Sequence, residues 1–216
     1  MTDENALRQS MVDGQLRPFD VTNQTVLGAV LDVARTDFVS GESRALVYTD
    51  AIMSVAPQSA RRLLRPMVIG RMLQAADIQP GEKVLDVASG SGYSAAVLSK
   101  MRAKVTALEN DGASVQIARS QSSRYGFTLV EGAIDRAPAG LGPFDVIMIN
   151  GVAQVEPETL LTALADGGRL VMLFGKGPAS YIRVTRRSGN DFGHSRIANA
   201  SGPALKEFAA NAEFVF

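Results

Sequence analysis

The spacing of apolar residues changes about a third of the way along the chain. In the first part, apolar side chains recur three and four positions apart, an interval that buries one face of a helix. Helices are expected over about residues 5–16, from residue 22 or 23 to 31, and over about 60–76. We predict that residues 1–78 form an N-terminal helical extension. It packs on a core of residues 79–216 within one structural domain.

Short apolar runs of strand length follow, separated by helical stretches. The expected strands cover residues 84–88, 105–109, 127–131, 144–150, 169–174, 181–187 and about 208–216, with helices between the first two and at 113–125 and 157–165. This alternation predicts an α/β fold with a doubly wound, mostly parallel, seven-stranded sheet. Ligands of such sheets lie at the carboxyl ends of the strands, near the switch point. Residues at such ends include Asp86, Gly90, Glu109, Gly132 and Asn150.

The first expected core strand ends in an acid and then breaks into small residues. Asp86 precedes the run Ala88-Ser89-Gly90-Ser91-Gly92, which we call the glycine loop (residues 88–92), and a helix follows. Small residues let a ligand lie against the backbone, and the start of the helix offers free N–H groups. Asp86 adds a negative charge. A nucleotide ligand that also carries a cationic ammonium fits this combination, and S-adenosylmethionine is such a ligand.

A second acid, Glu109, ends the next expected strand. In βαβ nucleotide-binding folds, an acid about 20 residues after the glycines binds the ribose hydroxyls. The alternative is an ordinary strand-turn-helix in which the glycines only serve tight packing. Two acids at consecutive strand ends favour nucleotide binding over that alternative.

The segment from Gly90 to Ala95 also satisfies the spacing of the dinucleotide-binding glycine motif, so NAD has to be considered. Asp86 would lie close to the pyrophosphate of such a ligand and repel it. No Tyr stands four residues before a Lys, as a hydride-transfer site would suggest. The sequence therefore favours S-adenosylmethionine, and a nicotinamide-dependent oxidoreductase is the least favoured interpretation. Nucleobase amino methylation is also disfavoured, because Asn150 is not followed by two prolines and an aromatic residue.

Composition excludes several classes of function. The formal net charge is 0, so we expect no nucleic-acid partner, and the absence of Cys excludes disulfides, thiolate zinc sites and a Cys nucleophile. No apolar run approaches the ~20 residues that span a bilayer, and the polar, acidic start of the chain is unlike a secretory signal. We therefore expect a cytoplasmic protein that does not act at a membrane.

Few residues in the chain are suited to acid–base catalysis. The single histidine, His194, falls in an expected turn at 190–194, where a surface or structural role is favoured. Transfer of a sulfonium methyl group needs little beyond alignment and desolvation, and an anionic acceptor needs no general base. We assign neither a catalytic residue nor a metal ligand.

At this point the chain resembles a known family, the protein-L-isoaspartate O-methyltransferases. The resemblance is carried by Met11–Leu16, Arg35–Val39, Leu46–Asp50, Pro80–Tyr93 and Pro143–Ile147. The segments before residue 51 are the specific part, because similar glycine loops occur in many methyltransferases. The resemblance implies a class I, Rossmann-like methyltransferase fold and S-adenosylmethionine as cofactor. It also implies repair of damaged proteins by methylation of the free carboxylate of isoaspartyl residues.

The resemblance and the strand ends together define an expected cofactor site. The expected cofactor-binding residues are Asp86, Ala88, Ser89, Gly90, Gly92, Glu109, Asn110, Gly132, Ala133 and Asn150. The family has a glycine where this chain has Ala88. It also has Gly-Asp-Gly after its third strand, where this chain has Gly132-Ala133-Ile134, with Asp135 nearby as a substitute.

The acceptor side departs further from the family. Counting back from Pro80 places Ala60–Pro66 on the family segment Gly-Gln-Thr-Ile-Ser-Gln-Pro, so Leu64 replaces a substrate-contacting Ser. We expect Leu64 and Arg65 to line the substrate site. Arg61, Arg62 and Arg65 form either the exposed face of a helix or a new anion site, since guanidinium binds carboxylate in bidentate fashion.

Two functions from different classes stay open. The first is an S-adenosylmethionine-dependent methyltransferase that acts on a protein or peptide with an acidic acceptor. The second is a cofactor-binding homologue with weak or no isoaspartyl activity and a regulatory or binding role.

Overall fold

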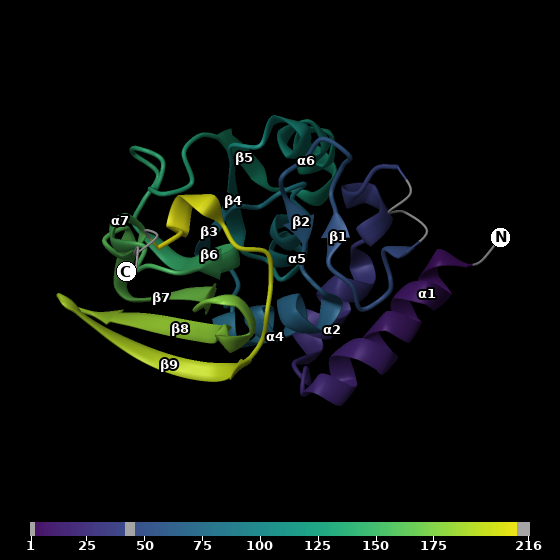
Figure 1. Cartoon of the computed structure of the whole chain (residues 1–216), viewed down its shortest axis with the longest axis horizontal. Helices are drawn as coiled ribbons and strands as arrows, with labels where there is room; N and C mark the ends of the chain where they lie inside the picture. Colours follow the sequence, from purple (N-terminus) through teal and green to yellow (C-terminus); the bar gives the residue numbers. More distant parts are fainter. Residues whose placement is uncertain (1–2, 42–45, 211–216) are drawn as a thin grey trace, which may run out of the picture.

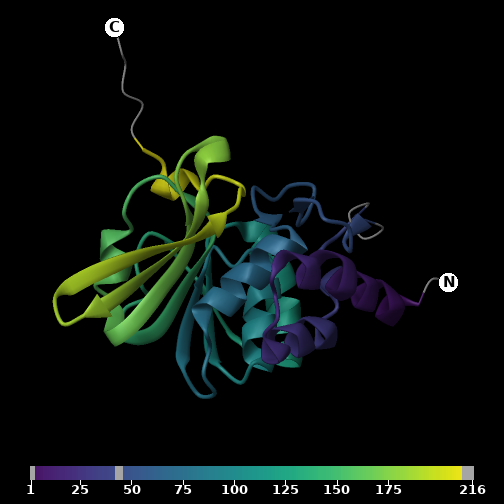
Figure 2. The same cartoon turned by 90° about the horizontal axis from the view of Figure 1, so that it is seen from below.

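A central β-sheet with helices and connecting segments on both faces forms the body of the molecule (Figure 1). The structure is a computed structural model and describes residues 3–41 and 46–210. In both views, α1 (Glu4–Met11) and the hairpin β8–β9 (Tyr181–Ser188 and Asp191–Asn199) lie at opposite ends of the molecule (Figure 2).

The chain before the sheet is mainly helical, as predicted. After α1 its elements are η1 (Val12–Leu16), η2 (Arg17–Phe19), α2 (Gln24–Asp32), η3 (Arg35–Phe38), β1 (Met53–Ser54), β2 (Arg62–Leu63) and α4 (Pro66–Ala76). The side chain of Asn23 caps α2 by accepting hydrogen bonds from the amides of Thr25 and Val26. Helix α4 has Pro66 at its first position, where a missing N–H costs nothing.

Strands and helices then alternate along the rest of the chain. Before β8 they are β3 (Lys83–Val87), α5 (Tyr93–Lys100), β4 (Lys104–Glu109), α6 (Gly112–Tyr125), β5 (Thr128–Glu131), β6 (Phe144–Ala153), α7 (Glu158–Leu161), β7 (Leu164–Phe174) and η4 (Gly177–Ala179). The 3-10 turn η5 (Lys206–Phe208) follows β9.

The large sheet has seven strands in the order β5-β4-β3-β6-β7-β8-β9. The first five of these are parallel, and β8 and β9 are antiparallel. The expectation of a doubly wound, mostly parallel, seven-stranded sheet is therefore confirmed. The strand order reverses between β3 and β6, so their carboxyl ends flank the switch point at which such sheets bind ligands.

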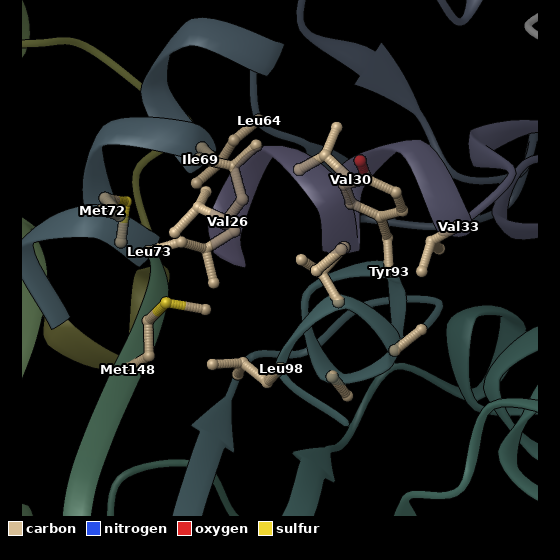
Figure 3. Packing of buried hydrophobic residues seen from close by; sticks show 14 of the residues in the cluster. Val26, Val30, Val33, Leu64, Ile69, Met72, Leu73, Tyr93, Leu98 and Met148 are labelled. Carbon is tan, nitrogen blue, oxygen red and sulfur yellow. The ribbon is translucent and has the colours of Figure 1, made fainter. Parts of the chain in front are cut away.

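Alternate residues along the strands point to two separate buried clusters. One cluster joins the sheet to α2, α4, α5 and α6, and the other joins it to α7 and η5. Figure 3 shows Val26 of α2 on the side of Met72 and Leu73 of α4 and Val30 on the side of Tyr93, with Leu98 of α5 and Met148 of β6 below them. The N-terminal elements and the core thus share one buried cluster.

Two expected helices begin or end elsewhere. The expected helix 60–76 starts only at Pro66, because residues 62–63 pair with β1 as an antiparallel strand. The expected helix 157–165 is a single turn, α7, and β7 begins at Leu164.

The seventh strand is not the expected one. We predicted a strand at about 208–216, but Phe208 ends η5, and residues 211–216 lie outside the described part of the chain. The sheet edge is instead formed by β9, which pairs with β8 and includes residues 191–194, for which we wrongly predicted a turn. Its side chains are mostly exposed on both faces, so it carries no apolar pattern that sequence analysis could detect.

A substitution of Gly92, which precedes α5, tests how tightly the glycine loop is packed. Its φ is +92°, and an added Cβ would lie 2.7 Å from Cζ of Phe127. We expect Gly92→Ala to lower the free energy of unfolding by about 2–4 kcal/mol, through backbone strain and overpacking. Urea denaturation measures this effect. Gly112→Ala is the control, because it adds a Cβ in open space within a helix. Equal effects of the two substitutions would contradict the prediction.

Candidate functional site

Asp86 lies near the carboxyl end of β3 and is fully buried. Its Oδ2 accepts hydrogen bonds from the hydroxyls of Ser89 and Ser94, each at 2.6 Å, and its Oδ1 accepts one from Nδ2 of Asn150 at 2.7 Å. Burial raises the pKa of Asp86 to about 6, although these hydrogen bonds act in the opposite direction. Both carboxyl oxygens are therefore used within the protein, and Asp86 fastens the glycine loop to α5 and β6.

The glycine loop has an unusual backbone. Ala88, Gly90 and Gly92 all have positive φ values, of 51°, 58° and 92°. Such values favour glycine, so the loop holds Ala88 in a conformation that the family's glycine adopts more easily. The hydroxyl of Ser91 is buried and has no hydrogen-bond partner within the described residues.

Glu109 ends β4 beside the glycine loop and is also fully buried. Its Oε2 accepts the amide of Gly90 at 2.7 Å. Its Oε1 accepts the amides of Asn110 at 2.7 Å and Asp111 at 2.9 Å. Parallel pairing of β3 with β4 places the two strand ends side by side, so the second acid stands next to the loop as the sequence predicted.

The partner that the sequence did not reveal is Arg61. Its Nε donates to Oε1 of Glu109 at 2.9 Å, and its Nη2 donates to Oδ1 of Asn110 at 2.6 Å and to Oε1 of Glu207 at 3.1 Å. Its exposed fraction is only 7%. Burial favours a lower pKa for Arg61, but the charges and hydrogen bonds of Glu109 and Glu207 together outweigh it and raise the pKa. Forty-eight residues separate the pair, so no local pattern indicates it.

The other two arginines are separated from Arg61. Arg62 is exposed on β2, and Arg65 is half-buried directly before α4. The expectation of one exposed helical face is therefore wrong, because residues 60–65 are extended or irregular. The side chains of Arg62 and Arg65 make no hydrogen bond or ion pair with any described residue. Leu64 is buried, and its carbonyl accepts a hydrogen bond from Nη2 of Arg35 at 3.1 Å.

The remaining expected cofactor residues lie around the same strand ends. Asn150 also donates to the carbonyl of Val87 at 3.1 Å, and the amide of Gly132 donates to the carbonyl of Glu109 at 3.0 Å. Ala133 is exposed. Asp135, the expected substitute for the family's acid, is exposed and pairs with Arg136 at 3.6 Å. It makes no described contact with Glu109 or the glycine loop.

A small cavity of about 20 Å³ separates the glycine loop from α4 and β2. Its lining includes Arg62, Leu64, Ala88, Gly90 and Asn150. This volume is about that of one water molecule. The residues suit a nucleoside in their chemistry, with a buried acid beside a small-residue loop. A nucleoside does not fit in this volume.

Other catalytic chemistries find no support in the described residues. His194 lies on the exposed strand β9, where Nδ1 stands 3.0 Å from the hydroxyl of Thr185. Within residues 3–41 and 46–210, no group of three His, Asp or Glu side chains is placed to hold a metal ion. In the same ranges, no helix combines the length and the apolar character needed to cross a bilayer.

Replacing Asp86 by Asn should remove a pH dependence from the stability of the protein. The pKa of Asp86 is about 6 in the folded state, above the ~3.9 of an unfolded chain. The folded state therefore binds this proton more tightly, and the parent loses stability as the pH rises from about 4 through 6. We expect the stability difference between parent and Asp86→Asn to change by on the order of 3 kcal/mol over that range. Urea denaturation across pH measures it. The exposed Asp135→Asn is the control, and a pH-independent difference would refute the assignment.

Comparison with known proteins agrees with this geometry. Residues 8–200 match the family model described as protein-L-isoaspartate(D-aspartate) O-methyltransferase. The chain is 34% identical over 196 residues to the protein-L-isoaspartate O-methyltransferase of Methylorubrum populi, covering 89% of this chain and 90% of that one. It is 30% identical over 193 residues to the enzyme of the same name from Koribacter versatilis, covering 88% and 86%.

A solved structure from Plasmodium falciparum shares the fold. It is assigned as a protein-L-isoaspartate O-methyltransferase in complex with S-adenosyl-L-homocysteine. The TM-score is 0.78 at 19% identity, over 96% of this chain and 100% of the other. The class of enzyme expected from the sequence, an S-adenosylmethionine-dependent O-methyltransferase, is confirmed by the family match and the curated relatives. The chain belongs to the protein-L-isoaspartate(D-aspartate) O-methyltransferase family.

Proposed function

We propose that the protein binds S-adenosylmethionine at the carboxyl ends of β3 and β4 and transfers its methyl group to a free carboxylate of damaged aspartyl residues. The observation that carries this proposal is the buried carboxylate of Glu109, which receives the amide of Gly90 in the loop that follows β3. Glu109 would hold the ribose hydroxyls. Gly90 and Gly92 would let the ligand approach the backbone.

The reaction asks little of the protein's side chains. When bound, the cofactor supplies an electrophilic methyl group on a sulfonium that is already a good leaving group. A carboxylate acceptor is a nucleophile without loss of a proton, so no general base is needed. The chain's own contribution is alignment of the acceptor and exclusion of water. Asp86 acts through the loop that it supports, because both of its oxygens are already bonded within the protein.

The acceptor would bind beside the small cavity near residues 62–64. Leu64 stands where the family has its substrate-contacting Ser and offers no side-chain donor. Arg62 lines this cavity, and Arg65 lines a neighbouring groove of about 300 Å³ beside residues 199–201. Neither lining includes an acidic side chain. Guanidinium groups in these positions suit an acceptor that carries carboxylates.

We further propose that the substrate is a protein or peptide and that the reaction serves protein repair in the cytoplasm. The alternative is a cofactor-binding homologue with weak or no isoaspartyl activity. Two observations favour it, namely the loss of the Ser at Leu64 and the guanidinium of Arg61 on Glu109. Membership of an enzyme family favours the methyltransferase.

Methyl transfer to peptides distinguishes the two functions. We expect the protein to transfer a radiolabelled methyl group from S-adenosylmethionine to an isoaspartyl peptide, and not to the same peptide with ordinary aspartate. Calorimetry with S-adenosylhomocysteine, with NAD as a negative control, measures cofactor binding independently. Binding of S-adenosylhomocysteine without any transfer would establish the non-catalytic alternative.

Arg62 and Arg65 should determine the affinity for the acceptor. We expect Arg62→Gln or Arg65→Gln to raise KM for an isoaspartyl peptide about 10-fold, because a charge-assisted hydrogen bond contributes about 1.5–3 kcal/mol. Binding of S-adenosylhomocysteine should not change. Arg71→Gln is the matched control, because Arg71 lies in α4, the helix that begins directly after Arg65. An unchanged KM in both variants would show that these arginines are merely solvated.

A further inference from the structure

Arg61 is bound to the carboxylate that the nucleoside requires. A carboxylate offers about four sites for hydrogen-bond donors. Glu109 already receives four, from the amides of Gly90, Asn110 and Asp111 and from Nε of Arg61. The three amides belong to the backbone that forms the site. Arg61 is the one side chain among these donors and binds Oε1, which also receives the amides of Asn110 and Asp111, so a ribose hydroxyl gains Oε1 only where Arg61 has left.

The side chains of the segment around Arg61 also cover the glycine loop. A Cβ added at Gly90 would lie 3.7 Å from Cβ of Arg61 and 3.8 Å from Cγ2 of Val55, which is van der Waals contact. The segment 55–65 therefore lies directly on the backbone that a nucleoside would approach. Departure of the guanidinium alone would leave this cover in place, so the segment has to move with it.

Polar contacts hold this segment at both ends of the site. The hydroxyl of Ser59 donates to Oδ2 of Asp111 at 2.8 Å, and the amide of Ala60 donates to Oδ1 of the same carboxylate at 3.1 Å. On the other side, Glu207 of η5 binds Nη2 of Arg61 and Nδ2 of Asn110. Arg61 thus connects the segment, the start of α6 and the C-terminal turn across the cofactor site.

We propose that Arg61 is a built-in competitor of the nucleoside, which closes the cofactor site and is displaced together with segment 55–65 when the cofactor binds. This inference rests on the proposed function. The same segment carries Arg62, Leu63 and Leu64, which line the small cavity on the acceptor side. Its displacement therefore moves part of the lining of the acceptor cavity as well.

Substitutions of Arg61 and Glu207 test the inference through the affinity for S-adenosylhomocysteine and the stability of the protein. Arg61→Ala leaves Glu109 buried without its counter-ion, which destabilises the free protein. We expect a lower Tm without ligand and at least 10-fold tighter binding of S-adenosylhomocysteine by calorimetry. Glu207→Gln removes the negative charge that faces Nη2 of Arg61 and Nδ2 of Asn110 and leaves the pair of Arg61 with Glu109 in place, so we expect about 3-fold tighter binding with little loss of stability. This second variant decides the question where Arg61→Ala does not fold.

Arg17→Ala is the matched control, because it breaks an Arg–Asp pair that is exposed on both sides and joins the N-terminal turns η1 and η2. We expect it to change neither binding nor Tm. Hydrogen exchange gives a second measurement. The amides of Ala60 and Arg61, which donate to Asp111 and to the hydroxyl of Ser59, should exchange faster when S-adenosylhomocysteine is added to the parent protein.

The possible outcomes separate the inference from the function on which it rests. Weaker binding in a folded Arg61→Ala would show that Arg61 contacts the ligand, and unchanged affinity in both variants would show that it does not compete; either result overturns the inference alone. Binding by the variants but not by the parent would support it strongly. Absence of binding in the parent and in both variants would overturn the proposed function together with the inference.

Discussion

The carboxylate of Glu109 is the contact on which the arrangement of the site depends. It is fully buried, and its donors come from the glycine loop, from the turn between β4 and α6 and from segment 55–65. A buried carboxylate is costly unless it is hydrogen-bonded and paired. Each of these elements is therefore held where the charge of Glu109 needs a donor. Glu109 is thereby held where the vicinal hydroxyls of a ligand would replace Arg61 as its donor.

Arg35 extends this constraint to the N-terminal part of the chain. It is fully buried, donates to the carbonyls of Val47 and Leu64, and lies 4.6 Å from the centre of the Tyr93 ring. These contacts tie the residues before α4 to the first residue of α5, behind the glycine loop. Through Arg35 the N-terminal elements therefore support two residues that line the small cavity, Leu64 and Tyr93. This accounts for why a resemblance to the family in these segments is informative about the site itself.

The chemistry of the site is simple because both of its buried acids are used in holding backbone and side chains together. Asp86 supports the glycine loop from behind, and Glu109 faces the segment that covers the loop. Neither arrangement presents a free base to an acceptor. A reaction between a sulfonium methyl group and a carboxylate suits such a site, since the driving force lies in the reactants and the protein provides alignment.

The sequence by itself determined the elements whose apolar pattern is local. Buried strands such as β6 and the break after Asp86 are visible in a few consecutive residues, and parallel pairing then brings Asp86 and Glu109 to one edge of the sheet. Strand β9 has no buried face, so its sequence resembles a turn. The extended course of residues 60–65 and the pairing of Arg61 with Glu109 were decided by tertiary structure. A buried acid pairs with the cation that the fold brings close to it, and this pair is 48 residues apart, so no local sequence pattern predicts it.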